Sequence, residues 1–281
     1  MRAPRFEAQK KKDATAFEGG VGKSNVMPLE EFDEIAAETI EGAERELEMI
    51  APSLQDLARR IQREQPDAVV FLDMSARIFG SPYKKYLSES MGSEAPQVHF
   101  YNDNDLKAYH YTDRTQFIKV AKEDFAPQEG KKIFFVDETF SHGKGAVALL
   151  EASAAAGVDA YYIALTKDPA PVEELMDEGR DRNVARYRSD GRITVYDNPL
   201  KDVFSRFASR LYVQDFQGET LSPHKQDKPA AENNIPDANK YSRPPAGMTI
   251  EEYNKELSVR TMRLVGQLKD RIYDTLMAEE A

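Results

Sequence analysis

The sequence predicts an α/β fold in which helices cover both faces of one parallel sheet of about five strands. Five short runs are apolar at nearly every position, as in strands buried on both faces. They span residues 68–72, 98–101, 133–136, 161–165 and 193–196. Helical patterns lie between most of them, at residues 82–91, 143–156, 171–178 and 200–211. Because strands and helices alternate, we expect a Rossmann-like, doubly wound sheet that binds its ligands at the carboxyl ends of the strands.

The composition excludes several classes of function. The chain has 281 residues, a formal net charge of -11 and no cysteine. A strongly acidic chain does not suit nucleic-acid coating, which depends on Lys and Arg neutralising phosphates. Without cysteine there is no disulfide, thiolate nucleophile or zinc-thiolate site. We found no signal peptide and no run of ~18 apolar residues that could span a membrane, so we expect a cytoplasmic protein.

The first 65 residues predict a flexible arm followed by a helical extension. Residues 1–27 show no sustained periodicity; their Gly19–Ser24 segment resembles part of a phosphate-binding P-loop, but Phe17 stands where that loop needs glycine. We therefore give the ATPase interpretation little weight. Residues 28–65 carry apolar side chains at helical spacing, and Pro52 is expected to separate a first helix from a second.

The core domain is expected over residues 66–215, followed by a linker at 216–247 that is rich in Gly, Ser, Pro and Asn. Thr249 and Glu252 form a capping box at the start of a final helix within residues 248–281. Its apolar stripe comprises Leu257, Thr261, Leu264, Leu268, Ile272 and Leu276. The stripe could dock on the core, on the early helices or on another subunit, so a homo-oligomer formed through the terminal helices is one open alternative.

The residues after the third apolar run have the chemistry of a sugar-phosphate site. The run delivers Asp137 and Glu138 to the carboxyl edge of the sheet, and a small-residue turn leads into a helix near Gly143. Backbone amides at such a turn, together with the positive end of the helix dipole, bind phosphate. Two neighbouring carboxylates do not bind phosphate. We therefore expect them to accept hydrogen bonds from sugar hydroxyls and to help hold a divalent cation.

Residues 133–145 resemble the PRPP-binding signature of type I phosphoribosyltransferases. The resemblance covers the apolar strand, the acid pair, Ser141 and Gly143. The chain departs from the signature at His142, usually a small residue or Thr, and at Lys144 and Gly145, where a hydroxylated residue is common. Lys144 offers a charge in place of the missing hydroxyl.

A second match lies after the first apolar run. Residues 73–77, Asp-Met-Ser-Ala-Arg, resemble the family's pyrophosphate loop, and Arg77 has a guanidinium suited to phosphate oxygens. Taken alone, this segment is an ordinary strand-to-helix turn. Its place ahead of the acid pair, in the family's order, strengthens the resemblance, which spans residues 66–212.

The resemblance implies a PRPP-dependent, Mg²⁺-using transferase that displaces pyrophosphate with the nitrogen of a small-molecule acceptor such as a nucleobase. Its implied catalytic residues are Asp137, Glu138 and Arg77, and the acid pair would also hold Mg²⁺. The implied PRPP contacts are Asp73, Ser75, Ala76 and Arg77 at the diphosphate, Asp137 and Glu138 at the ribose, and Ser141, His142, Gly143, Lys144 and Gly145 at the 5-phosphate.

The resemblance also implies a mobile catalytic loop after the second strand and an acceptor loop after the last one. Residues 102–122 would form the mobile loop, with Lys107, His110, Arg114 and Lys119 as candidates to close over the diphosphate. Residues 197–199 would contact the acceptor. For each single residue, a solvated surface position is the simpler interpretation.

Two alternatives stay open. A binding or regulatory module could keep the fold and sense PRPP or a nucleotide without turnover; the altered phosphate turn and the long helical ends favour it. A response-regulator or hydrolase-like domain using Asp73 or Asp137 alone is weaker because it leaves Glu138 without a role.

Overall fold

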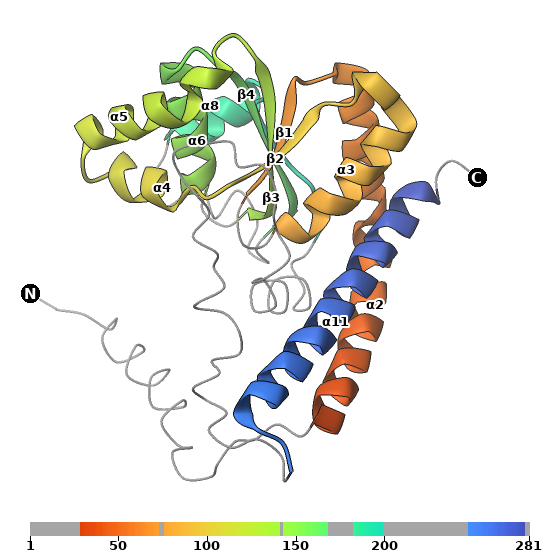
Figure 1. Cartoon of the computed structure of the whole chain (residues 1–281). Helices are drawn as coiled ribbons and strands as arrows, with labels where there is room; N and C mark the ends of the chain where they lie inside the picture. Colours follow the sequence, from red (N-terminus) through yellow and green to blue (C-terminus); the bar gives the residue numbers. More distant parts are fainter. Residues whose placement is uncertain (1–28, 73–75, 141–142, 168–181, 199–246, 279–281) are drawn as a thin grey trace, which may run out of the picture.

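The computed structural model describes residues 29–72, 76–140, 143–167, 182–198 and 247–278 (Figure 1). The predicted arm, most of the predicted linker and the helices expected at 171–178 and 200–211 lie outside these residues. Within the described part of the chain, no helix has the length and apolar composition needed to span a lipid bilayer.

One parallel sheet forms the centre of the fold, as predicted. Its strands are β1 (Ala68–Leu72), β2 (Gln97–Tyr101), β3 (Lys132–Phe140), β4 (Asp159–Lys167) and β5 (Ile193–Val195). They lie in the order β2-β1-β3-β4-β5, and every neighbouring pair is parallel. The direction of winding changes between β1 and β3, and in such sheets a crevice for ligands forms at this switch point.

Helices cover both faces of the sheet. One face packs against α4 (Asn104–His110), α5 (Arg114–Phe125), α6 (Lys144–Ala155) and α8 (Arg182–Ser189). The other packs against α2 (Leu29–Glu64), α3 (Arg77–Met91) and α11 (Ile250–Met277), and short 3₁₀ turns follow α3 (Gly92–Glu94) and α5 (Ala126–Gln128). Alternate residues of β3 separate the two cores: Phe134 and Val136 lie in the core with α2 and α3, and Ile133 and Phe135 in the core with α5 and α6.

Strand β3 is longer than the sequence predicted. We expected a turn after Val136, but the strand continues to Phe140 because β4 is equally long and pairs with it up to Lys167. The Thr139 and Thr166 hydroxyl oxygens lie 3.0 Å apart in this extension. Since β1 pairs with β3 only as far as Val136, the last four residues of β3 lie beyond its pairing with β1.

Helix α2 is one continuous helix, so the expected break at Pro52 was wrong. A proline inside a helix removes one backbone hydrogen bond and costs ~3 kcal/mol. Pro52 is exposed, so water can satisfy the carbonyl that it leaves unpaired. On the opposite side, Ile50, Leu54 and Leu57 continue one buried stripe across the proline, and the burial of that stripe offsets the lost bond.

Helix α11 runs beside α2 in the same direction (Figure 1). The predicted capping box is confirmed: the Thr249 hydroxyl accepts from the Glu252 amide at 3.2 Å, and the Glu252 carboxylate accepts from the Thr249 amide at 2.8 Å. The described part of the stripe, Leu264, Leu268, Ile272 and Leu276, is buried in the core that contains α2 and α3. The stripe therefore docks on early helices of its own chain.

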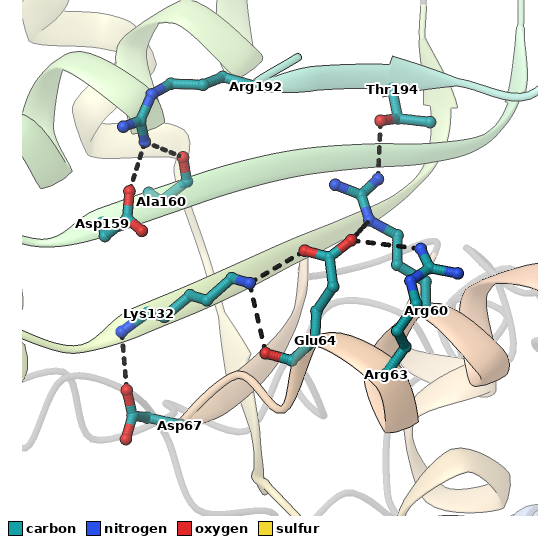
Figure 2. Close-up of polar contacts among 9 residues, drawn as sticks. All are labelled: Arg60, Arg63, Glu64, Asp67, Lys132, Asp159, Ala160, Arg192 and Thr194. Carbon is teal, nitrogen blue, oxygen red and sulfur yellow. Dashed lines mark hydrogen bonds and ion pairs between the residues drawn. The ribbon is translucent and has the colours of Figure 1, made fainter. Parts of the chain in front are cut away.

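A charged network fastens the end of α2 to the amino edge of the sheet (Figure 2). The Glu64 carboxylate accepts a hydrogen bond of 2.9 Å from the Lys132 ammonium of β3 and another of 2.9 Å from the Arg60 guanidinium. Arg60 also donates to the Thr194 hydroxyl of β5 at 2.8 Å. These contacts place α2 across β3, β4 and β5, and they leave the carboxyl edge at the other end of the strands.

Candidate functional site

Asp137 lies near the carboxyl end of β3 and is held by a tyrosine of β4. The Tyr162 hydroxyl donates a hydrogen bond of 2.5 Å to Asp137 Oδ2. The register explains the pairing: Phe135 pairs with Tyr162 and Asp137 with Ala164, so Tyr162 and Asp137 are diagonal neighbours on one face of the sheet. The sequence analysis assigned Tyr162 only to a core strand.

An ion pair at the start of α4 stands beside this carboxyl group. Asp103 follows β2 and is buried, and its Oδ2 lies 2.8 Å from the Lys107 ammonium. Lys107 in turn covers the start of α6, because a Cβ added at Gly145 would lie 2.6 Å from Lys107 Cε. The residue after β2, the later part of β3, the middle of β4 and the first turn of α6 therefore meet at one place.

The pKa of Asp137 is raised above its usual value, chiefly because burial disfavours the charged carboxylate. The hydrogen bond from Tyr162 and the charge of Lys107 oppose this rise, and the charge of Asp103 adds to it. A carboxyl group with a perturbed pKa at the ligand-binding edge of a doubly wound sheet is a candidate for function.

The start of α6 provides an anion-binding geometry. Gly143 is the N-cap with φ of +68°, and no side chain caps the helix there. A Cβ at Gly143 would lie 2.8 Å from Val184 and 3.0 Å from Phe140, so both conformation and packing require glycine. The first amides of a helix and its dipole attract anions. Lys107 stands on one side of this helix start, and the exposed Lys144 is its first residue.

Glu138 is the second acid of the expected pair. Consecutive strand residues point to opposite faces, so Glu138 is expected to point away from the face on which Asp137 meets Tyr162. Glu138 is 2% exposed. In addition, no group of three or more His, Cys, Asp or Glu side chains in the described residues could hold a metal. The Mg²⁺ site on Asp137 and Glu138 therefore stays a prediction.

Several predicted site residues lie outside the described part of the chain, namely Asp73, Ser75, Ser141 and His142. Ala76 is buried at the N-cap of α3, and Arg77 is the first residue of that helix. The diphosphate role of residues 73–77 stays a prediction.

The region expected as a mobile loop is largely helical, because α4 and α5 occupy most of residues 102–122. Its basic residues are held by acids of the surrounding helices: Glu151 of α6 lies 3.2 Å from His110 and 2.8 Å from Arg114, and Lys119 lies 3.9 Å from Glu123. Of the predicted basic candidates, Lys107 is the one that reaches the start of α6.

The expected acceptor loop is anchored to the core. The Asn198 amide donates to the Ser53 hydroxyl at 2.7 Å and to the Leu165 carbonyl at 2.9 Å. Lys167 at the end of β4 pairs with the exposed Asp197 at 2.5 Å. Asn198 therefore links β4 to α2, and Asp197 remains the exposed acid of this loop.

Comparisons with known proteins give only distant similarity to solved structures. No protein-family model matches the chain, and no curated protein matches it. Among solved structures, HGPRT-ase from Leishmania tarentolae in complex with GMP aligns with a TM-score of 0.31 and 13% identity, over 45% of this chain and 69% of that one. Purine phosphoribosyltransferase from Pyrococcus horikoshii Ot3 aligns with a TM-score of 0.27 and 14% identity, over 43% and 74%. These TM-scores are too low to assign the site.

Proposed function

We propose that this chain binds PRPP at the carboxyl edge of the sheet and transfers its phosphoribosyl group to the nitrogen of a small acceptor, with release of pyrophosphate. The observation that carries the proposal is the meeting of Asp137, the glycine-capped start of α6 and Lys107 at the edge beside the β1/β3 switch point. A sugar phosphate needs an anion-binding group for its phosphate and a hydrogen-bond acceptor for its ribose hydroxyls, and the two must lie side by side.

The start of α6 would hold the 5-phosphate. Its backbone amides provide hydrogen bonds, and the ammonium groups of Lys107 and Lys144 provide charge. Ser141 and His142 belong to the same turn in the sequence. Lys107 is paired with Asp103 at 2.8 Å in the ligand-free chain, so it would exchange this carboxylate for phosphate oxygens when PRPP binds.

Asp137 would accept a hydrogen bond from a ribose hydroxyl and favour positive charge developing at C1. In the reaction, the bond from C1 to the pyrophosphate oxygen breaks, and the acceptor nitrogen supplies the electron pair of the new bond to C1. The protein contributes position and electrostatics. Asp73, Ser75, Ala76 and Arg77 would face the diphosphate, and no step is assigned to a protein-bound metal.

A second candidate is a module that binds PRPP or a nucleotide without turnover. Two observations favour it: Glu138 is buried, and α4 and α5 stand where a mobile catalytic loop was expected. Both functions share the same binding site, so binding and turnover have to be measured separately.

The first prediction is that Asp137→Asn weakens PRPP binding by at least ~10-fold, since a hydrogen bond to a charged group contributes ~1.5 to 3 kcal/mol. Isothermal titration with PRPP measures this. Asp159→Asn, at the amino edge of β4, is the matched control and should bind as the parent does. Pyrophosphate release with a panel of nucleobases then distinguishes the two functions.

Each combination of PRPP binding and pyrophosphate release points to a different function. Binding with pyrophosphate release supports the transferase, and binding without release for any base favours the sensing module. A well-folded Asp137→Asn variant that binds PRPP as tightly as the parent would contradict the ribose role of Asp137. A parent chain that binds no PRPP would contradict both functions.

A further inference from the structure

We infer that Glu151 of α6 is a positioning residue that holds both sides of the anion-binding helix start in place. This inference rests on the proposed function, in which the start of α6 binds the 5-phosphate of PRPP. Glu151 lies seven residues after Lys144, two turns along the same helix and about 10 Å from its first residue. It therefore acts on the phosphate site through other residues rather than by touching the ligand.

Both carboxylate oxygens of Glu151 contact side chains of neighbouring helices. One oxygen, Oε2, lies 3.2 Å from His110 Nε2 of α4 and 2.8 Å from the Arg114 guanidinium of α5. The other, Oε1, accepts a hydrogen bond of 3.2 Å from the Asn183 amide of α8. The side chains of His110 and Glu151 are 6% and 19% exposed, so their contact is largely shielded from water. One carboxylate thus links α6 to α4, α5 and α8.

On the α4 side, the contact with His110 fixes the helix that carries Lys107. Residues three apart in a helix lie on one side of it, and here both meet α6. Lys107 covers the first turn of α6, because a Cβ added at Gly145 would lie 2.6 Å from Lys107 Cε. The His110 ring also packs edge-on against the Phe117 ring of α5, with centroids 5.0 Å apart. The histidine therefore anchors α4 one turn beyond the lysine that reaches the helix start.

On the α8 side, the contact with Asn183 fixes the neighbouring Val184. A Cβ added at Gly143 would lie 2.8 Å from Val184 Cγ2, so Val184 packs directly on the N-cap of α6. Lys107 and Val184 thus lie against the same helix start from two different helices, and one carboxylate fastens both helices. Loss of that carboxylate should loosen both sides of the phosphate site together.

The chain offers a matched control at the opposite edge of the sheet. Glu64 also links its helix to a neighbouring element, through the Lys132 ammonium of β3 at 2.9 Å, and its side chain is 25% exposed. Glu64→Gln and Glu151→Gln each remove one charge from a partly buried network of polar contacts. Both should lower stability, but only Glu151→Gln should change the phosphate site.

The second prediction is that Glu151→Gln weakens PRPP binding by at least ~5-fold, because a displaced Lys107 loses part of its charge-assisted contact with the phosphate. Isothermal titration of the parent, Glu151→Gln and Glu64→Gln, well below their melting temperatures, measures this. Glu64→Gln should bind as the parent does. In a Lys107→Ala background the further loss caused by Glu151→Gln should be smaller, since the lysine that it positions is gone. An undiminished loss in that background would overturn the positioning of Lys107.

A ligand-free measurement tests the inference independently of PRPP. The parent should show a nuclear Overhauser effect between the ε protons of Lys107 and the α protons of Gly145. This effect should weaken in Glu151→Gln and persist in Glu64→Gln. An unchanged effect in well-folded Glu151→Gln would overturn the role of Glu151, whether or not PRPP binds. If the parent binds no PRPP while the effect weakens as expected, the proposed function falls and the positioning role of Glu151 stands.

Asn183→Ala is a milder variant that keeps the test available if Glu151→Gln folds poorly. It removes the α8 contact and leaves the contacts of Glu151 with α4 and α5. We expect it to weaken the nuclear Overhauser effect between the Val184 methyl protons and the α protons of Gly143, while the effect between Lys107 and α6 persists. An unchanged Val184 effect would overturn the α8 half of the inference.

Discussion

Asp137, the residue proposed to bind the ribose, has an environment that disfavours its charged form. Its pKa is raised in the folded chain, chiefly by burial, so ionising it costs more in the folded state than in the unfolded state. The folded state therefore loses stability as pH rises from the unfolded value, ~3.9, through the raised folded value. Below both values the carboxyl is neutral in each state, and this loss disappears.

The third prediction follows from that sign. Asp137→Asn should raise the melting temperature near neutral pH, because a neutral amide can still accept from Tyr162 without a buried charge. The gain should vanish near pH 3, where the parent carboxyl is protonated. Thermal unfolding at the two pH values measures both effects. A lower melting temperature for the variant at neutral pH would contradict the burial argument.

The sequence identified Asp137, Gly143 and Lys107, because an acid after a strand and a glycine before a helix leave a local signal. It missed Asp103 and Tyr162 as partners. Tyr162 sits inside an apolar run and meets Asp137 only through the register of β3 with β4, which the sequence does not specify. A search for polar atoms at alternate positions of neighbouring strands could have found it.

At the scale of the element, the positions of the strands were predictable from the sequence, but the lengths of the strands and helices were not. All five apolar runs became strands because β-branched and aromatic residues fill both faces of the buried sheet. The extra length of β3 depends on its pairing with β4, and the continuity of α2 through Pro52 depends on burial against other helices. Both are tertiary effects that override local signals.

The charged end of α2 gives the fourth prediction. Burial opposes ionisation of Glu64, but hydrogen bonds and charges from Lys132 and Arg60 lower its pKa overall. Its contribution to stability is therefore present above the unfolded pKa, ~4.3, and is lost as pH falls through the folded value. Glu64→Gln should cost about 1 kcal/mol near neutral pH, since these pairs are partly exposed.

Urea unfolding at two pH values tests the Glu64 prediction. The cost should be present at pH 7 and absent near pH 3. Glu41→Gln provides the control, because Glu41 pairs with Arg45 on the exposed side of α2, with both side chains more than half exposed. An equal cost for Glu64→Gln at both pH values would show that packing rather than charge fastens this end of the helix.

At the scale of the whole molecule, the two long helices α2 and α11 share the core on one face of the sheet. Helix α2 crosses the sheet on the face opposite α6, and α11 packs on α2 and α3 (Figure 1). The sequence left the docking partner of α11 undecided. An apolar stripe indicates that one face of a helix is buried, but it does not indicate which surface covers that face. The structure assigns that partner within the chain and places the stripe in the same core as Val136, one residue before Asp137.

The last prediction is that the chain unfolds as one unit that includes α11. Leu268 is 1% exposed in the shared core, whereas Met262 on the same helix is 39% exposed. Leu268→Ala should cost ~2 to 5 kcal/mol, because it removes buried methyl groups and leaves a cavity, and Met262→Ala should change stability by less than ~0.5 kcal/mol. If α11 is part of the cooperative unit, near-UV and far-UV circular dichroism should report one coincident urea transition that Leu268→Ala shifts as a whole. Two separate transitions, with Leu268→Ala affecting only the helical one, would instead show that α11 is an appendage to an independently stable α/β core.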